Sequence, residues 1–337
     1  MSLKGNNIDV SKMYSEYSPY PGRFIKLLSD INIVRKRFYS FLAKRYRFNE
    51  KSAYDWVKGR FLGFTPSSDA QITIIDVGCG TGEHTLDFAI AFPNAKVIGI
   101  DNSSGSLKYA EELRNYFGIN NVQFIKKDLE GESLNDLGKF DLLNCSGVLH
   151  HVENPNNALK NITKLMKTNS ILWIYLYADF GRHREYAARK GIRLIFPDDN
   201  LLRERANLAK ELDLNRSVLS MGESKYLKYR WKFLRTKKNL SYWGYHNYTD
   251  RNGDNDIYDG FAHPIVDYYD TKKIWMLMSE GGLDLLQYNM QVNANIEKVI
   301  RPHLEQKKIY DSMEIAESLY YPQSYYLLLS LAKICDN

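Results

Sequence analysis

The sequence predicts an α/β fold built on a doubly wound, largely parallel sheet. Short apolar runs rich in β-branched residues alternate with amphipathic segments between residues 70 and 178, which is the spacing of right-handed βαβ crossovers. The first run ends in a glycine-rich turn, and the second ends in an acidic residue, Asp101. Ligands of such sheets bind where the carboxyl ends of the strands meet, so we expect the functional site at that edge.

Seven segments are predicted as strands. Short, continuous apolar runs are typical of strands that are buried on both faces of a sheet. Five such runs precede residue 180, and two more lie near the C-terminus. The predicted strands are Gln71–Val77, Ala95–Ile100, Val122–Lys126, Phe140–Cys145, Ile171–Tyr177, Leu283–Tyr288 and Ser324–Ala332.

Helices are predicted between these strands from apolar residues that recur three and four positions apart. One such face holds Leu107, Ala110, Leu113 and Phe117, and another holds Ala158, Ile162, Leu165 and Met166. A third helix, Lys272–Gly281, is expected to end at Gly281-Gly282, because glycine is common just after a helix C-terminus.

Four regions are predicted along the chain. Residues 1–60 are expected to form a helical cap, 61–178 the core of the sheet domain, 179–262 an insertion that acts as a lid, and 263–337 the rest of the core. The insertion is basic and then acidic, with sixteen Lys and Arg in 182–238 and six Asp in 250–270. Two solvated faces that pair with each other, or a site for an anionic partner, both fit this pattern.

The composition excludes several classes of protein. The three cysteines are too few and too scattered for a disulfide framework or a zinc site, which favours a reducing cytoplasm. Apolar stretches are shorter than a membrane span, and the first residues lack the apolar centre of a signal peptide. We therefore expect a cytoplasmic protein with no membrane partner.

The glycine-rich turn has the chemistry of a nucleotide-binding turn. It reads Asp76-Val77-Gly78-Cys79-Gly80-Thr81-Gly82, and glycines let backbone N–H groups approach a ligand closely. The spacing differs from the dinucleotide pattern G-x-G-x-x-G. Asp76 would repel a pyrophosphate but suits a cationic amino-acid group, which disfavours an NAD-dependent oxidoreductase. Asp101 is placed to accept hydrogen bonds from the ribose hydroxyls.

Four motifs in this order resemble those of the class I S-adenosylmethionine (SAM) dependent methyltransferases. The glycine turn resembles their first motif, Asp101-Asn102 their ribose-binding position, and Lys127-Asp128-Leu129 the segment that flanks adenine. The run Phe140–His151 resembles their fourth-strand motif, which passes beneath the methionine part of the cofactor. The resemblance implies a seven-stranded Rossmann-like methyltransferase sheet that ends in an antiparallel pair, with SAM as cofactor and S-adenosyl-L-homocysteine as product.

The resemblance also implies a set of cofactor-binding residues. Tyr20 is included because the proline-braced segment Tyr14–Arg23 resembles a Pro-Tyr-Pro-Arg stretch that precedes the core in a group of bacterial proteins. Packing within the cap is the alternative for Tyr20. The predicted cofactor-binding residues are Asp76, Gly78, Cys79, Gly80, Gly82, Asp101, Asn102, Asp128, Leu129, Cys145 and Tyr20.

Three residues are candidates for catalysis. Methyl transfer requires alignment of the acceptor with the methyl group and exclusion of water. His151 follows the fourth strand and is a candidate base, although the His150-His151 pair can instead fix the loop. Tyr177 lies at the end of the fifth strand, and His263 precedes Pro264, where a structural turn is the alternative. No metal is expected, because adjacent histidines rarely both bind one ion.

The predicted function is methyl transfer to a small-molecule O, N or C atom in a lidded cavity. The fourth strand reads Asn144-Cys145-Ser146-Gly147, where nucleic-acid amino methyltransferases of the family carry Asn/Asp-Pro-Pro-Tyr, so a nucleic-acid acceptor is disfavoured. A protein lysine side chain is an alternative acceptor, attracted by Asp254, Asp256 and Asp259. A catalytically silent, SAM-binding regulatory protein is an alternative of another class.

Overall fold

A computed structural model describes most of the chain between residues 50 and 332. The described residues are 50–61, 65–131, 133–179, 183–198, 201, 204–205, 207–208, 263–290, 294–319 and 325–332. Those up to 183 and from 265 onward belong to one compact unit, and those between 184 and 264 belong to another. The sheet lies entirely in the first unit.

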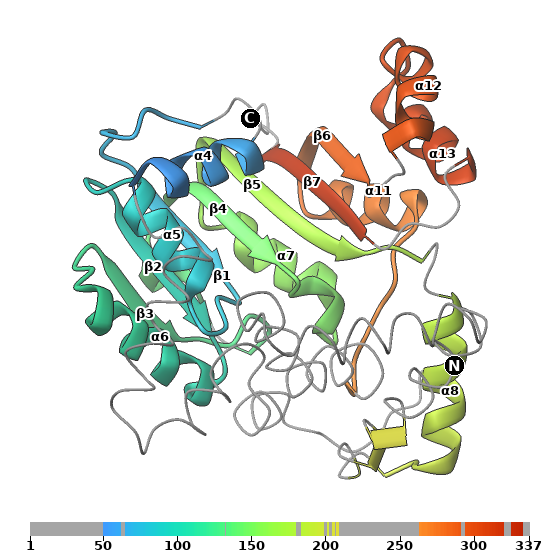
Figure 1. Cartoon of the computed structure of the whole chain (residues 1–337), viewed down its shortest axis with the longest axis horizontal. Coiled ribbons are helices and arrows are strands. Elements are labelled where there is room, and N and C mark those ends of the chain that lie inside the picture. Colours follow the sequence, from blue (N-terminus) through green and yellow to red (C-terminus); the bar gives the residue numbers. More distant parts are fainter. Residues whose placement is uncertain are drawn as a thin grey trace, which may run out of the picture. The chain divides into compact units, whose positions relative to one another are not determined.

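The sheet has seven strands in the order β3-β2-β1-β4-β5-β7-β6 (Figure 1). The first five strands are mutually parallel, whereas β7 is antiparallel to both β5 and β6. An α/β fold with a parallel sheet of five strands is therefore confirmed. The strands are β1 (Thr73–Val77), β2 (Lys96–Asp101), β3 (Val122–Lys126), β4 (Phe140–Ser146), β5 (Met166–Tyr177), β6 (Leu283–Met290) and β7 (Tyr325–Ala332).

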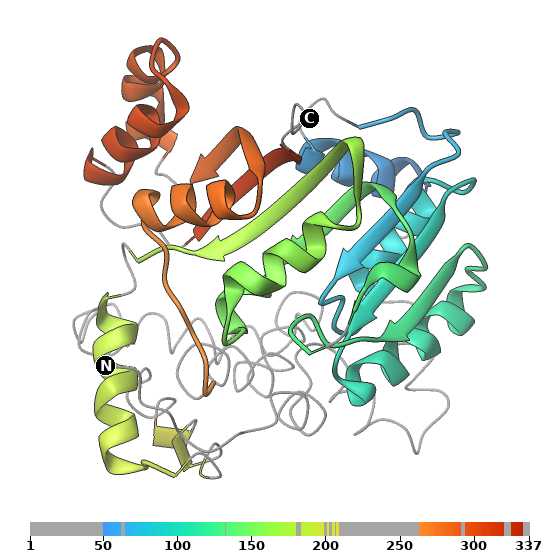
Figure 2. The same cartoon turned by 180° about the vertical axis from the view of Figure 1, so that it is seen from behind.

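Helices cover both faces of the sheet. α4 (Glu50–Phe61) and α5 (Glu83–Ala91) pack together on one face, and α7 (Pro155–Thr163) and α11 (Thr271–Glu280) pack together on the other (Figures 1 and 2). Ser103 caps the N-terminus of α6 (Ser104–Phe117), because its Oγ accepts a hydrogen bond from the Ser106 N–H. The side chains of Leu107, Ala110 and Leu113 are buried, as their spacing predicts.

Several segments differ from the sequence prediction. α7 ends at Thr163 and does not reach Met166, which instead begins β5 and pairs with Phe140. β5 therefore starts five residues earlier than Ile171, because polar residues 167–169 continue the strand at its exposed end. Two helices that the sequence prediction omitted, α12 (Ala294–Leu304) and α13 (Ile309–Leu319), lie between β6 and β7. A ring contact between Trp275 and Tyr310 joins α13 to α11.

The predicted cap and lid stay predictions, because most of their residues lie outside the described part of the chain. This holds for residues 1–49, with Tyr20, and for 209–262, with Asp254, Asp256 and Asp259. In the described parts of the predicted cap and the predicted lid, the structure shows α4 and α8 (His183–Ile195), respectively. None of the helices among the described residues is long and apolar enough to cross a bilayer.

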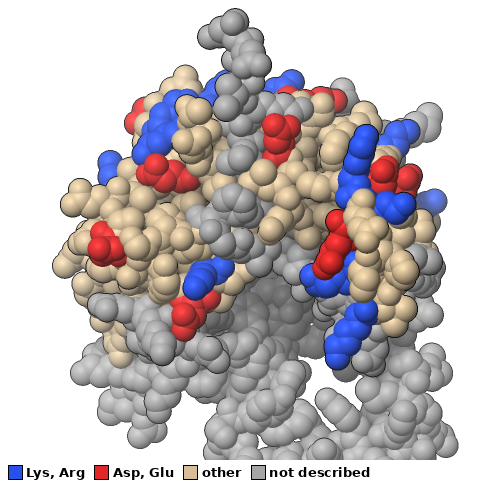
Figure 3. Space-filling view, turned by 90° about the horizontal axis from the view of Figure 1, so that it is seen from above, with Lys and Arg blue, Asp and Glu red and all other residues tan. Residues whose placement is uncertain are grey.

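Acidic and basic side chains are mixed on the surface seen in Figure 3. Lys and Arg side chains stand beside Asp and Glu over the described part of this face. Binding to a nucleic-acid backbone relies on many basic residues that contact phosphates together. Most of the basic run 182–238 lies outside the described residues.

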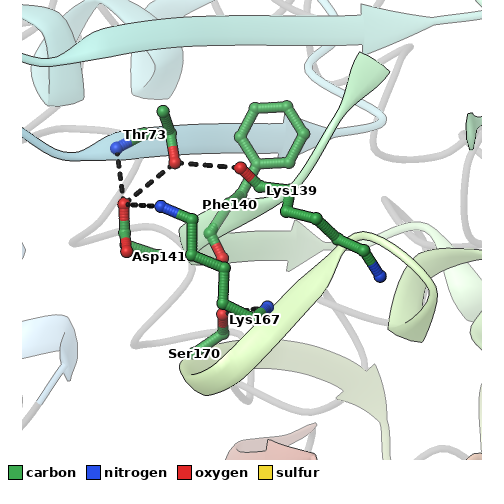
Figure 4. Close-up of polar contacts among 6 residues, drawn as sticks. All are labelled: Thr73, Lys139, Phe140, Asp141, Lys167 and Ser170. Atoms are coloured by element: carbon green, nitrogen blue, oxygen red, sulfur yellow. Dashed lines mark hydrogen bonds and ion pairs between the residues drawn. The ribbon is translucent and has the colours of Figure 1, made fainter. Parts of the chain in front are cut away.

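A polar cluster fastens the amino ends of β1, β4 and β5 (Figure 4). Asp141 Oδ2 accepts hydrogen bonds from the Thr73 N–H at 2.8 Å, from Thr73 Oγ1 at 2.9 Å and from Lys167 Nζ at 2.7 Å. Ser170 Oγ donates to the Phe140 carbonyl and accepts from the Lys167 N–H. The cluster lies at a register shift between Phe140 and Leu142, so it fixes the strands at the edge opposite the predicted site.

Candidate functional site

The glycine turn between β1 and α5 has a backbone that only glycine adopts without strain. Gly78, Gly80 and Gly82 have φ angles of 66°, 54° and 83°, in the left-handed region. A Cβ atom on Gly78 would lie 2.2 Å from Val148 Cγ2, and one on Gly82 would lie 2.7 Å from Ala110 Cβ. The Cys79 N–H donates to the Ile100 carbonyl at 2.9 Å, which ties the turn to β2.

Asp101 holds the glycine turn from the end of β2. Its Oδ2 accepts a hydrogen bond from the Gly80 N–H at 2.9 Å, and its Oδ1 accepts one from the Ser103 N–H at 2.8 Å. Burial raises the pKa of Asp101, while these backbone N–H groups oppose that rise. The carboxylate is half-buried and lies between the turn and the N-terminus of α6. Its neighbour Asn102 is half-buried as well.

The end of β3 joins this edge. The Lys127 N–H donates to the Asp101 carbonyl at 3.1 Å, which brings the next residue, Asp128, to the same side as the turn. Asp128 Oδ1 accepts a hydrogen bond from the Glu130 N–H at 3.0 Å, which shapes the loop. The side chain of Leu129 belongs to the hydrophobic core, so the cofactor contact predicted for it would come from its backbone.

Asp76 lies beneath the turn, and its carboxylate already has protein partners. Only 2% of the residue is exposed. Thr85 Oγ1 donates to Oδ2 at 2.6 Å, and Asn144 Nδ2 donates to Oδ1 at 2.5 Å. The predicted role of Asp76 in cofactor binding is therefore one that it would exert through the turn, because so little of the residue is exposed to a ligand.

The two described cysteines are buried thiols. Cys145 is completely buried within the hydrophobic core, and Cys79 is 9% exposed. Burial raises the pKa of both thiols, which keeps them protonated and unreactive. The prediction that Cys145 contacts the cofactor thus rests on its backbone at the end of β4.

An aromatic cluster stands at the carboxyl ends of β4 and β5. The rings of His150 and Tyr177 stack with centroids 3.8 Å apart, and the His151 ring meets that of Tyr177 edge-on at 5.6 Å. Tyr175 packs against Tyr177 at 5.8 Å. The candidate catalytic residues are therefore brought together: His151 lies in a short helical turn that follows β4, and Tyr177 lies at the end of β5.

The two histidines differ in their hydrogen bonds. His150 Nδ1 accepts a bond from the Tyr177 N–H at 3.3 Å, so its proton is assigned to Nε2. His151 Nδ1 lies 3.0 Å from the Ile265 carbonyl, which can only accept, so His151 carries its proton on Nδ1 and its lone pair on Nε2. His151 thus has the tautomer that a general base acting through Nε2 requires.

The segment Ile265–Asp270 completes this cluster and was missed in the sequence. The Asp267 N–H donates to the His150 carbonyl at 2.8 Å, and the Tyr269 N–H donates to the Tyr177 carbonyl at 2.9 Å. The ring of Tyr268 stacks on that of Tyr177 at 6.5 Å. One signal in the sequence could have pointed to the end of this segment. Asp270 is a residue type that often caps helices, and its side chain accepts a hydrogen bond from the Lys273 N–H in the first turn of α11.

His263 lies in the other compact unit. It is fully buried there, and its carbonyl accepts a hydrogen bond from Arg189 Nη2. Arg193 Nη1 donates to the Pro264 carbonyl at 2.9 Å, so the backbone at this His-Pro step is fixed by two arginines of α8. These contacts support the turn alternative, and the catalytic role of His263 stays a prediction. The described residues contain no group of three or more His, Cys, Asp or Glu arranged to hold a metal ion.

Comparison with known proteins gives several matches. A family described as "Methyltransferase domain" matches residues 68–224. An uncharacterised protein of Synechococcus sp. is 34% identical over 157 residues, which are 44% of this chain and 35% of that protein. The malonyl-[acyl-carrier protein] O-methyltransferase of Halalkalibacterium halodurans is 27% identical over 144 residues, covering 42% of this chain and 51% of that enzyme. The chain thus spans about half or less of the length of these curated relatives.

Solved structures share the fold. PKMT2 from Rickettsia typhi superposes with a TM-score of 0.56 at 19% identity, over 83% of this chain and 52% of that one. The same protein in complex with AdoHcy gives a TM-score of 0.52 at 17% identity.

Proposed function

Because residues 68–224 belong to the class I SAM-dependent methyltransferases, we propose that this chain binds SAM at the glycine turn and transfers its methyl group to a small-molecule acceptor. The observation that carries the proposal is the turn itself. Its three left-handed glycines are held against the Asp101 carboxylate at the carboxyl edge of a parallel sheet.

The residues at this edge fit SAM. The glycines leave room for the close approach of a ligand to the backbone, and Asp101 offers carboxylate oxygens to ribose hydroxyls. Asn102 belongs to the same proposed ribose position as Asp101, and Asp128 and Leu129 flank the place proposed for adenine. When bound, SAM supplies an electrophilic methyl group, so the protein has only to position the acceptor and exclude water.

The aromatic cluster is proposed to line the acceptor side. Tyr177 presents its ring beside both histidines. His151 is proposed to remove a proton from an acceptor that carries one. Matched relatives named as O-methyltransferases for malonyl-[acyl-carrier protein] and for ubiquinone biosynthesis support an oxygen acceptor. The lid at 179–262 and a cytoplasmic location are part of the same proposal.

Calorimetry tests the cofactor half of this proposal. The purified chain is expected to bind SAM and S-adenosyl-L-homocysteine saturably, with no binding of NAD. The Asp101→Ala variant should bind SAM about 1–3 kcal/mol more weakly, because hydrogen bonds to a charged group are lost. Asp136→Ala is the matched control, since Asp136 is exposed and pairs with Lys127. Equal affinity in the two variants would remove Asp101 from the site.

Methyl-labelled SAM tests the acceptor half. The chain is incubated with cell extract, which is then separated into small-molecule and protein fractions. We expect label in a small molecule. Label in protein would favour the lysine-type alternative, and label in neither fraction would favour a catalytically silent SAM-binding protein.

A further inference from the structure

A row of polar and aromatic side chains crosses the sheet beneath the glycine turn. Asp76 on β1 is the register partner of Asn144 on β4, which in turn is the partner of Trp173 on β5. Register partners on neighbouring parallel strands point to the same face. Thr85 of α5 bonds to Asp76, so this row faces the layer formed by α4 and α5.

Arg60 of α4 reaches onto this row from outside the strands. Its guanidinium carbon lies 3.9 Å from the ring centroid of Trp173 and 4.3 Å from that of Trp56. Its Nη1 donates a hydrogen bond to Asn144 Oδ1 at 2.7 Å. The two indole rings hold the planar guanidinium, as cation–π contacts do.

Arg60 and Asp76 together fix which way the Asn144 amide points. An amide group can present either its oxygen or its nitrogen to a neighbour. Because Arg60 can only donate, it takes the oxygen of Asn144, and the nitrogen is left to donate to Asp76 at 2.5 Å. Without Arg60, the oxygen of Asn144 loses this donor, and Asp76 loses the positive charge of the guanidinium.

Arg60 also places a positive charge where it acts on a buried carboxylate, that of Asp76. A buried anion is costly unless it is paired and hydrogen-bonded. Burial raises the pKa of Asp76, and the bonds from Thr85 and Asn144 and the charge of Arg60 oppose that rise. Asp76 lies two residues before Gly78, so its placement fixes the start of the turn.

We infer that Arg60 is a positioning residue for cofactor binding, which sets the glycine turn through Asn144 and Asp76. The inference rests on the proposed function, because its readout is the affinity for SAM. Arg60 lies outside residues 68–224, the segment that matches the family. The turn is thus completed by a helix that precedes the matched domain.

The test compares Arg60→Met with Lys58→Met in the full chain. Both variants lose one positive charge from α4, but Lys58 is exposed. We expect Arg60→Met to weaken SAM binding by about tenfold or more, the equivalent of one charge-assisted hydrogen bond, and Lys58→Met to bind as the wild type does. Once the acceptor is known, the KM for SAM should rise while kcat at saturating SAM stays unchanged.

Two further variants test the route. Arg60→Lys keeps the charge but loses the planar guanidinium group. The affinity of this variant for SAM should therefore lie between those of Arg60→Met and the wild type. If Arg60→Met does not fold, the comparison with Lys58→Met is made with Arg60→Lys instead. Asn144→Leu removes the intermediate residue. If Arg60 acts through it, adding Arg60→Met to Asn144→Leu should weaken SAM binding no further.

The outcomes separate the inference from the proposed function. A wild-type chain that binds no SAM overturns the proposed function. A wild type that binds SAM, with Arg60→Met and Arg60→Lys binding equally well but melting at lower temperature, overturns the inference alone. Additive losses in the double variant overturn the route through Asn144.

Discussion

The two halves of the candidate site are built by different means. On the side of β1 and β2, the glycine turn is held mainly by backbone hydrogen bonds. The Cys79 N–H donates to the Ile100 carbonyl, and the Gly80 N–H donates to the Asp101 carboxylate. On the side of β4 and β5, side-chain rings from His150, Tyr177 and Tyr268 pack together. The side at β1 and β2, which is proposed to bind SAM and is called the cofactor half below, is therefore sensitive to backbone geometry. The side at β4 and β5, which is proposed to bind the acceptor and is called the acceptor half, is built from side-chain rings.

Substitution of Gly78 should have the largest effect, because this residue lies where the two halves touch. Gly78→Ala places a Cβ in the left-handed region and 2.2 Å from Val148 Cγ2. Backbone strain and overpacking together should cost about 3 kcal/mol of unfolding free energy, measured by urea denaturation. SAM binding should fall as well.

A matched control separates the two causes. Gly118 has the same φ of 66°, but a Cβ there would meet nothing within 4 Å, so Gly118→Ala should cost only the strain of about 1–2 kcal/mol. Adding Val148→Ala to Gly78→Ala should recover part of the loss. No recovery would show that the halves are not in contact at this point.

A buried carboxylate beneath the cofactor half should give an intermediate, pH-dependent effect. Asp87 on α5 is 3% exposed, and burial raises its pKa to about 8. The folded chain then holds this proton more tightly than the unfolded chain, whose Asp pKa is about 3.9. Stability therefore falls as pH rises from about 4 to about 8.

The Asp87→Asn variant should lose this dependence. Between pH 5 and pH 9, its unfolding free energy should change less than that of the wild type by at least about 1.4 kcal/mol, the value of one pKa unit. Asp55→Asn, at an exposed position on α4, serves as the control. Identical pH profiles for Asp87→Asn and the wild type would contradict the assigned proton.

Tyr177 should show the smallest effect, on the acceptor half. Tyr177→Leu removes the ring that stacks on His150 and should lower the unfolding free energy by about 1 kcal/mol, while affinity for SAM stays unchanged. Tyr177→Phe keeps the ring and should match the wild type in both measurements. A tenfold loss of SAM affinity in Tyr177→Leu would erase the distinction between the halves.

The cofactor half could be predicted because its signals are local. Gly78, Gly80 and Gly82 are visible as a run, and Asp101 and Asp128 follow apolar strands whose ends must meet. The parallel strands and α6 follow from apolar patterns of the same short range. The sequence could not show that the Asp76 carboxylate accepts hydrogen bonds from Thr85 and Asn144.

The acceptor half depends on contacts between distant residues. His151 and Ile265 are 114 residues apart, and nothing in the run before Asp270 signals that it lies along β5. Arg60 and Asn144 are separated by 84 residues, so their bond has no local pattern. The start of β5 was missed for another reason, since it is polar, and its first polar residue, Lys167, bonds to Asp141 and Ser170.

The cluster around Asp141 has a consequence for how such a protein can change. Its hydrogen bonds join the amino ends of β1, β4 and β5, at the edge of the sheet opposite the proposed site. The alignment of these strands is thus held by residues that lie outside the candidate site. Tyr177 and Tyr268 are not part of this cluster, so we expect that they can be substituted while the sheet stays aligned, which makes them the first positions to change in a redesign of the proposed acceptor side.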